Sequence, residues 1–580
     1  MNNDQRSIRA AVEARLAKRH RAEKRFQLYG LGAIGLAVAF LALLLVSIVF
    51  QSVTAFSAHR LTLPVTLEAA LVDPAGDRSE ASLRAGQYNT AIQTALRDEF
   101  PSVEDRTALR ELFGLYSAVN AAELLRQVVE DPSLVGETVR FTLPLGDDAD
   151  LYLKGATVEE SFRDGPAPLR IEIEGGAARL SAGGAVFGDF AETVRRTARA
   201  RIDTALARAE IAEADAATMV DPDEREILLA EAERARALAR TLAERADGAA
   251  GLVLGPQTPS LLIRAAGGVF EVQTIAPGAA EATAEILVAP DAAPAGPVAD
   301  WTLWSLETPP AARLITDRQI AWTRTLAERG LIENGFNTWL FTNADSREPE
   351  LAGVLGALIG SILTMIVTMF LAVPIGVGAA IYLEEFAPKN RFTDFIEVNI
   401  NNLAAVPSIV FGLLGLAVFI NAFGMPRSAP VVGGMVLALM TLPTVIISSR
   451  AALKAVPPSI REAALGVGAS KTQAVFHHVL PLAMPGILTG TIIGLAQALG
   501  ETAPLLMIGM VAFIADPPTL GVSGFTEPAT VMPVQIFLWS TGAERAFEAR
   551  TAAAILILLS LMILFNAVAI YLRRRFERRW

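Results

Sequence analysis

The chain contains no cysteine in 580 residues and only four histidines. Disulfide bonds and thiolate metal sites are therefore excluded. His477 and His478 are adjacent, and neighbouring residues on a helix face different directions, so we expect no metal site there. The nearest match to a phosphate-binding loop, GVGASKT at 466–472, lacks the glycine that should precede its lysine. We therefore expect neither a catalytic residue nor a metal site on this chain.

Charged residues are missing from long stretches of a chain that is 52% hydrophobic. The first stretch, residues 29–50, follows a basic segment, 1–28, and is about the 20 residues that a membrane-spanning helix needs. The apolar core of a cleaved signal peptide is shorter, about 7–15 residues. We expect an uncleaved first transmembrane helix at 29–51 with the basic N-terminus in the cytoplasm. The positive-inside rule explains these cations, so no nucleic-acid partner is inferred.

Five further apolar stretches follow near the C-terminus. They cover 351–383, 395–420, 431–448, 483–514 and 551–572. Six crossings would place the basic loops, the 449–482 connection and the basic tail 573–580 all in the cytoplasm. The pattern predicts an all-α polytopic membrane protein of six transmembrane helices, with residues 351–572 as its main transmembrane domain.

Residues 52–350 contain no apolar span and are acidic, with 28 Lys and Arg against 47 Asp and Glu. We expect this segment to be an inserted α+β domain outside the inner membrane, with a solvated acidic surface. Helical spacing favours a helical region over 84–135. Short strands are expected at 169–173, 261–263, 269–272 and 286–288.

A helical hairpin is expected near 190–248, within this domain. The segment is rich in Ala, Arg and Glu and is interrupted at 221–224, where Asp221 as N-cap and Pro222 at the first helical position predict the start of a new helix. The two helices could pack on each other or support self-association of the chain. Packing of the two helices on each other needs fewer assumptions. The role of the whole 52–350 domain stays open at this point.

The stretch REAALGVGASKTQAVFHHVLP, residues 461–481, reads as a helix-turn-helix between two apolar spans. Ser459 as N-cap with Glu462 three residues later would form a capping box, so a helix is expected from about Ile460. Glycines at 466 and 468 permit a turn. A second helix is then expected from 472 to 479, ended by Leu480 and Pro481.

This stretch resembles the EAA loop of ABC importer permeases, and we call residues 459–481 the EAA loop. The positions on or beside the family pattern are Arg461, Glu462, Ala463, Ala464, Gly468, Leu480 and Pro481, while His478 stands where the family has isoleucine. The resemblance implies that the first helix docks on a separate ATPase subunit. ATP and magnesium would bind that partner, and this chain would carry no cofactor and perform no hydrolysis.

The fifth span carries three glycines four residues apart, Gly486, Gly490 and Gly494, which allow a neighbouring helix to approach closely. On a continuous helix, Glu501 lies on the same face, with Gln497 nearby. Pro504 predicts a break over 500–504, with Thr502 as a candidate cap. An ionisable group within a span is costly, which favours a functional role for Glu501. Further candidates for the pathway or gate lie in the third span: Asn402, its neighbour Asn401, and Ser408.

GETAPLL at 500–506 and AVPSIVFGLLGL at 405–416 resemble the PstA permeases of phosphate ABC importers, over roughly 351–572. The resemblance implies a bacterial inner-membrane permease that imports phosphate by alternating access. It implies a homologous PstC-type permease, two copies of an ATPase subunit, a periplasmic phosphate-binding protein and membrane lipids as partners. A permease for molybdate or sulfate is the alternative within the class. A second alternative, from a different functional class, is a membrane signalling protein that senses through residues 52–350, although we expect no output domain after Leu572.

Glu501 poses a problem for anion transport, because the spans contain no Lys, Arg or His. The partner permease could supply an arginine that pairs with Glu501. The carboxyl could instead be protonated and donate a hydrogen bond, or it could belong to a gate. Pairing across the subunit interface is the favoured explanation.

Overall fold

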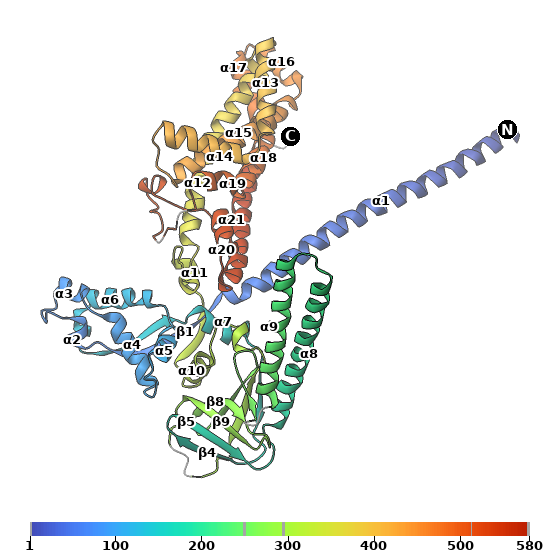
Figure 1. Cartoon of the computed structure of the whole chain (residues 1–580). Coiled ribbons are helices and arrows are strands. Elements are labelled where there is room, and N and C mark those ends of the chain that lie inside the picture. The colour runs from blue at the N-terminus through green and yellow to red at the C-terminus, as the bar shows by residue number, and fades with distance from the viewer. Residues whose placement is uncertain (1–2, 248–250, 293–295, 512, 515, 577–580) are drawn as a thin grey trace. The chain divides into compact units, whose positions relative to one another are not determined.

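The computed structural model describes residues 3–247, 251–292, 296–511, 513–514 and 516–576. The chain divides into two compact units. One, the helical unit, comprises Met1–Ser57 and Phe336–Trp580, and the other, the α+β unit, comprises Ala58–Gly335 (Figure 1). Phe56 and Asn337 lie where the chain leaves and re-enters the helical unit. The backbone N–H of Asn337 donates to the Phe56 carbonyl at 2.9 Å, so the α+β unit is an insertion whose two ends lie close together.

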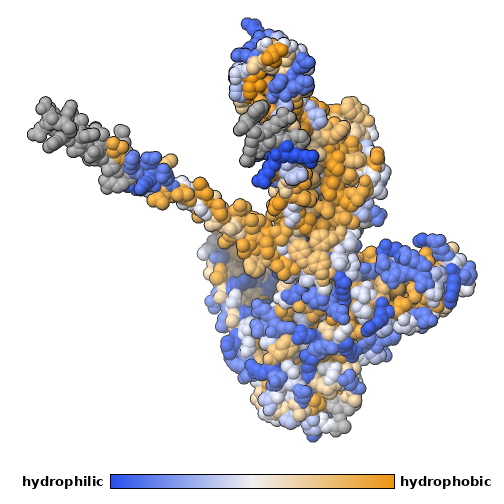
Figure 2. All heavy atoms as spheres, turned by 180° about the vertical axis from the view of Figure 1, so that it is seen from behind, coloured by the Kyte–Doolittle hydropathy of each residue, from blue (hydrophilic) through white to orange (hydrophobic). Residues whose placement is uncertain are grey.

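Among the described residues of the helical unit, five helical segments are long and apolar enough to cross a membrane. The helices concerned are α1 (Asn3–Ser52), α12 (Leu355–Ile381), α15 (Pro430–Lys454), α18 (Leu480–Leu499) and α21 (Ala546–Phe576). Figure 2 shows hydrophobic residues gathered along the long helices of this unit, whereas the α+β unit is mainly hydrophilic.

The third expected span, 395–420, is not a straight helix. It is a pair, α13 (Arg391–Ala404) and α14 (Ser408–Leu414), the latter continued by a π-helix η7 (Gly415–Ala422), and the pair bends by 104°. Pro407 causes the break, because it lacks an N–H and disfavours the helical conformation of Val406 before it. The described chain therefore has five candidate spans, or six if the bent pair counts as one.

Helix α15 is the centre of the helical unit, since it packs against both α12 and α18. The short α19 (Ala503–Met507) packs on α14, and α20 (Met532–Ser540) packs on α21. Val432, Val436 and Leu437 of α15 share a core with Leu505. The short α11 (Trp339–Thr342) lies between the insertion and α12.

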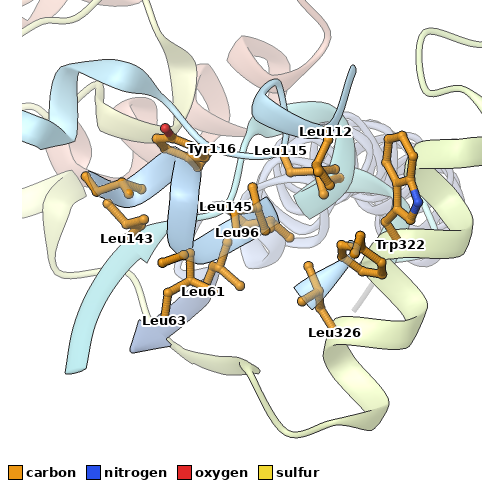
Figure 3. Packing of buried hydrophobic residues seen from close by; sticks show 14 of the residues in the cluster. Leu61, Leu63, Leu96, Leu112, Leu115, Tyr116, Leu143, Leu145, Trp322 and Leu326 are labelled. Atoms are coloured by element: carbon orange, nitrogen blue, oxygen red, sulfur yellow. The ribbon is translucent and has the colours of Figure 1, made fainter. Parts of the chain in front are cut away.

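Among its described residues, the α+β unit has two sheets, each packed against a large hydrophobic core. The smaller sheet has the order β11-β1-β2, built from β1 (Ser57–Thr66), β2 (Thr138–Pro144) and β11 (Ile332–Phe336). The region 84–135 is divided into several helices. The helices around this sheet are α2 (Ala69–Val72), α3 (Glu80–Arg84), α4 (Tyr88–Glu99), α5 (Arg106–Phe113), α6 (Ala121–Glu130), α7 (Asp147–Leu153) and α10 (Asp317–Glu328). Figure 3 shows Leu61 and Leu63 of β1 in a common core with Leu96 of α4 and Trp322 of α10.

The larger sheet has the order β3-β10-β7-β8-β9-β5-β4, with β6 paired to β8. Its strands are β3 (Glu160–Asp164), β4 (Leu169–Glu174), β5 (Ala177–Ala182), β6 (Leu252–Val253), β7 (Ser260–Ala265), β8 (Gly268–Ile275), β9 (Glu281–Val288) and β10 (Trp301–Leu306). The four strand segments expected from the sequence lie within β4, β7, β8 and β9, and these expectations are confirmed.

Helices α8 (Gly188–Thr218) and α9 (Pro222–Asp247) pack together as a long hairpin through small residues such as Ala209, Ala212 and Ala232. Asp221 lies before α9, and its carboxylate accepts a hydrogen bond from the Asp223 N–H at 2.9 Å. The expected cap at Asp221 is therefore confirmed.

Candidate functional site

The EAA loop begins with α16 (Pro458–Gly466), whose N-cap is Pro457. Pro458 occupies the first helical turn, where its missing N–H costs nothing, and it moves the helix start ahead of Ser459. The expected capping box between Ser459 and Glu462 is therefore wrong. A capping box forms instead at Ser470 and Gln473, at the start of α17 (Lys471–Ala474).

The turn between α16 and α17 depends on one glycine. Gly468 has φ +90°, a left-handed conformation, and its N–H donates to the Leu465 carbonyl at 3.0 Å. Gly466 is the last residue of α16 and does not have a positive φ. The helix-turn-helix therefore requires glycine at 468 for its backbone and not at 466.

The second helix of the loop does not end at Leu480 and Pro481 as expected. It passes through a π-helix, η8 (Val475–Val479), into α18, so that Lys471–Leu499 is a continuous helical segment. Pro481 has no N–H to donate to the carbonyl four residues earlier, and the wider π turn just before it accommodates this. The EAA loop and the glycine-bearing span are consequently joined without a hinge loop.

The four residues at 461–464 face two different ways. Glu462 and Ala463 are exposed, as are the neighbouring apolar side chains of Leu465 (50%) and Val467 (86%). Ala464 is buried, and the Arg461 guanidinium turns inward. Leu480 and Pro481 are half-buried. The outer side of the loop is therefore an exposed patch of mixed apolar and acidic character.

Arg461 donates hydrogen bonds to Glu385, Val456 and Leu453. Its Nη2 lies 2.5 Å from Glu385 Oε1, and its Nε lies 3.0 and 3.1 Å from the two carboxylate oxygens. Nη1 donates to the Val456 carbonyl at 2.7 Å and Nη2 to the Leu453 carbonyl at 2.8 Å. Sequence reasoning found Arg461 but missed Glu385.

A second ion-pair group lies beside the first and was also missed. Arg450 Nη2 lies 2.6 Å from Glu397 Oε1, and its Nε lies 3.5 Å from Glu384 Oε2. The available signal was the pair of glutamates just beyond one apolar run, together with an arginine just beyond another. Opposite charges at the ends of different spans favour pairing.

The glycines of α18 face α15 in antiparallel register. A Cβ at Gly490 would overlap the Ser448 side chain, and one at Gly486 would lie 2.6 Å from Ala452 Cβ. At Gly494 the nearest atom, in Thr444, would be 3.7 Å away, which is an ordinary contact. The close approach of the two helices therefore depends on the first two glycines of the stripe.

The expected break in the fifth span is confirmed, because α18 ends at Leu499 and α19 begins at Ala503. Thr502 is the N-cap of α19, but its side chain makes no capping hydrogen bond. The helical-wheel placement of Glu501 does not apply, since the helix ends two residues before it. Glu501 is half-buried in this chain.

The two segments that carry the sequence resemblance contact each other in the structure. Gly412 of α14 packs directly on Pro504 of α19, because a Cβ at Gly412 would lie 2.7 Å from Pro504 Cα. Ser408, one turn earlier on α14, is half-buried, and Asn402 and its neighbour Asn401 are exposed on α13. Gln497 of α18 is exposed as well.

These polar side chains are not joined into a closed network. Within the described ranges, no hydrogen bond joins the side chains of Asn402, Ser408, Gln497, Glu501 and Thr502 to one another, and the Glu501 carboxylate has no partner there. In the same part of the chain, no group of three or more His, Asp or Glu side chains is placed to hold a metal ion. The arrangement offers a partly exposed carboxylate at a helix break, next to a tight helix contact.

Comparison with known proteins assigns families to two parts of the chain. Residues 372–580 match the family described as "Binding-protein-dependent transport system inner membrane component". Residues 13–162 match the family described as "Domain of unknown function (DUF3333)".

Individual relatives match part of the chain. The chain is 33% identical to the probable ABC transporter permease protein YqgI of Bacillus subtilis, over 30% of this chain and 60% of that protein. It is 32% identical to the phosphate transport system permease protein PstA 1 of Mycobacterium tuberculosis, over 38% of this chain and 70% of that protein. A solved chain of the MetNI methionine ABC transporter is 18% identical, with a TM-score of 0.30, over 39% of this chain and 96% of that one.

Proposed function

Because this chain belongs to the PstA-type permeases of phosphate ABC transporters, we propose that it is the transmembrane subunit of an ATP-driven importer of inorganic phosphate. The PstA relatives support phosphate as the substrate, and the structural observation that supports the coupling is the continuity between the EAA loop and the broken span. Lys471–Leu499 is one helical segment that ends at the Gly500–Thr502 break. A displacement of the loop therefore reaches the pathway candidates without an intervening flexible connection.

Coupling starts at the exposed side of α16. Glu462, Ala463, Leu465 and Val467 are accessible there and would dock on a separate ATPase subunit, which binds the ATP and magnesium. Two ATPase copies, a PstC-type permease and a periplasmic phosphate-binding protein would complete the importer in the bacterial inner membrane. Alternating access then requires the paired spans to rearrange around a path near the middle of the membrane.

The α+β unit would lie on the periplasmic side, with both chain termini in the cytoplasm. This orientation is inferred from the basic residues in the N-terminal half of α1 and in the last turn of α21. The insertion ends meet at Phe56 and Asn337, so the unit can be present without interrupting the permease.

Within the path we assign Glu501 a partner on the other permease. Its carboxylate is half-buried and unpaired among the described residues, and an arginine across the subunit interface would satisfy it. Thr502, Gln497, Asn402 and Ser408 are the further pathway candidates of this chain.

The test is uptake of labelled phosphate into proteoliposomes that hold the complete complex and the binding protein. Wild-type complex should accumulate phosphate only with ATP, and Glu501→Gln should impair uptake while the complex still assembles. Unchanged phosphate uptake by Glu501→Gln would remove the pairing hypothesis. Uptake of molybdate or sulfate in place of phosphate would contradict the assigned substrate and leave the permease class in place.

A further inference from the structure

Arg461 has an unusual number of partners for a residue at the start of a loop helix. Its guanidinium makes five hydrogen bonds, three to the Glu385 carboxylate and one each to the carbonyls of Leu453 and Val456. The Arg461 side chain is 24% exposed and that of Glu385 only 7%. This ion pair is thus largely removed from solvent, and its geometry is the planar fork that favours arginine over lysine.

The acceptors belong to different helices. Leu453 lies in the last turn of α15 and Val456 just beyond its end, where helix carbonyls lack intrahelical donors and the helix dipole favours a cation. Glu385 lies in the π-helix η6 (Tyr382–Phe386) that continues α12. A single guanidinium on α16 therefore ties together the ends of α12 and α15.

The π turn at the end of α12 places two consecutive glutamates on two different arginines. Glu385 pairs with Arg461 of α16, and Glu384 lies near Arg450 of α15, which also bonds Glu397 of α13. Since both carboxylates contact neighbouring helices, the end of α12 is held from two sides.

We propose that Arg461 is a positioning residue that transmits displacement of α16 to α12 and α15, in addition to the covalent connection from the EAA loop to α18. The inference rests on the proposed function, in which α16 docks on the ATPase. Moving α16 alone would break five hydrogen bonds and leave the buried Glu385 carboxylate unpaired, which is strongly unfavourable. The three helices must consequently move together.

The test uses the complete complex with Arg461→Lys, Arg461→Ala and Glu385→Gln. Lysine keeps the charge but loses the fork, so it separates geometry from charge. Lys389→Gln, an exposed position in the nearby 387–390 connection, removes one charge from the same region and is the matched control. Three quantities are measured on equal amounts of purified complex: ATP hydrolysis, phosphate uptake per ATP, and ATP-dependent labelling of a cysteine introduced at Gln497. This chain has no native cysteine, so the label carried by this subunit, once separated from its partners by denaturing electrophoresis, reports position 497 alone.

Uptake per ATP should fall about tenfold in Arg461→Ala and Glu385→Gln, with a smaller loss in Arg461→Lys and none in Lys389→Gln. ATP hydrolysis should continue, while the ATP-dependent change in labelling at 497 should shrink in the Arg461 and Glu385 variants. A wild-type ratio of phosphate uptake to ATP hydrolysis in the Arg461 and Glu385 variants, together with wild-type labelling at 497, would overturn the inference. A parallel loss of assembly, hydrolysis and uptake would also overturn it, because that result indicates a purely structural pair. If the wild-type complex hydrolyses ATP without taking up phosphate, the proposed substrate fails, and the labelling at 497 still tests Arg461.

Discussion

Replacing Gly468 with alanine should uncouple ATP hydrolysis from phosphate uptake. Gly468 has φ +90°, and an added Cβ would meet no atom within 4 Å. Space is therefore sufficient, and the cost is purely conformational. A left-handed conformation costs an L-residue roughly 1–2 kcal/mol, which lowers the population of the native turn about 5- to 30-fold relative to its alternatives. Since this turn fixes α16 on α17, the docking helix should lose its orientation.

Gly466 provides a matched control only two residues away. A methyl group added there would also meet no atom within 4 Å, but Gly466 is the last residue of α16 and does not have a positive φ. Alanine is a better helix former than glycine by about 1 kcal/mol, so Gly466→Ala should be neutral or slightly stabilising. Any difference between the two variants reports the backbone conformation at 468 alone.

The assay compares phosphate uptake and ATP hydrolysis in proteoliposomes, with phosphate capture by the separate binding protein measured alongside. Gly468→Ala should lower uptake per ATP, and Gly468→Val should lower it further because a β-branched residue tolerates positive φ poorly. Capture should be unchanged in both. Equal ratios of phosphate uptake to ATP hydrolysis in Gly468→Ala and Gly466→Ala would refute this prediction, because they would show that the turn does not control coupling.

Three further predictions concern other parts of the chain. Burial and neighbouring carboxylates raise the pKa of Glu271 to about 8, so its stabilising contribution is complete below about pH 4.5 and is lost as the pH rises through 8. Between pH 5 and pH 9 the wild-type chain should lose more stability to thermal unfolding than Glu271→Gln does. The difference between the two losses should be at most about 5 kcal/mol, and identical pH profiles of the two proteins would contradict the prediction. Gly490→Ala should disrupt packing against Ser448 and lower the yield of folded protein, whereas Gly494→Ala should be tolerated; equal yields from size-exclusion chromatography would count against the close contact. Replacing 58–335 with a short linker should preserve basal uptake, because the insertion ends already meet; complete loss of uptake with normal membrane insertion would make the unit part of the transport path.

Local sequence signals predicted some helix starts and breaks well. Pro504 indicated the helix break, because its effects on the backbone act within a turn. Asp221 indicated the start of α9 for the same reason. The errors arose where two local signals competed. Pro458 overrode the cap expected at Ser459, and Pro481 was accommodated by a π turn that sequence periodicity does not reveal.

Contacts between distant segments could not be predicted from these signals. Arg461 and Glu385 are 76 positions apart, and their pairing depends on how α12 and α16 are brought together. The bend at Pro407 was missed for a related reason, since apolar content alone suggested a single straight span over 395–420. Composition determined how many apolar segments exist, and packing determined which of their ends meet.

The two connections that leave the EAA loop converge on α15. One runs through the continuous helical segment Lys471–Leu499, which contacts α15 closely at Gly490 and Ser448. The other runs through Arg461, which holds both the end of α15 and Glu385 at the end of α12. If α16 moves, the proposed mechanism therefore requires α12, α15 and α18 to move as a group. The helix is interrupted at the edge of that group, at Gly500–Thr502. Helix α19 follows, and its Pro504 packs on Gly412 of α14. A gate at this junction would respond to ATP through both connections, and this is the place where Glu501 lies.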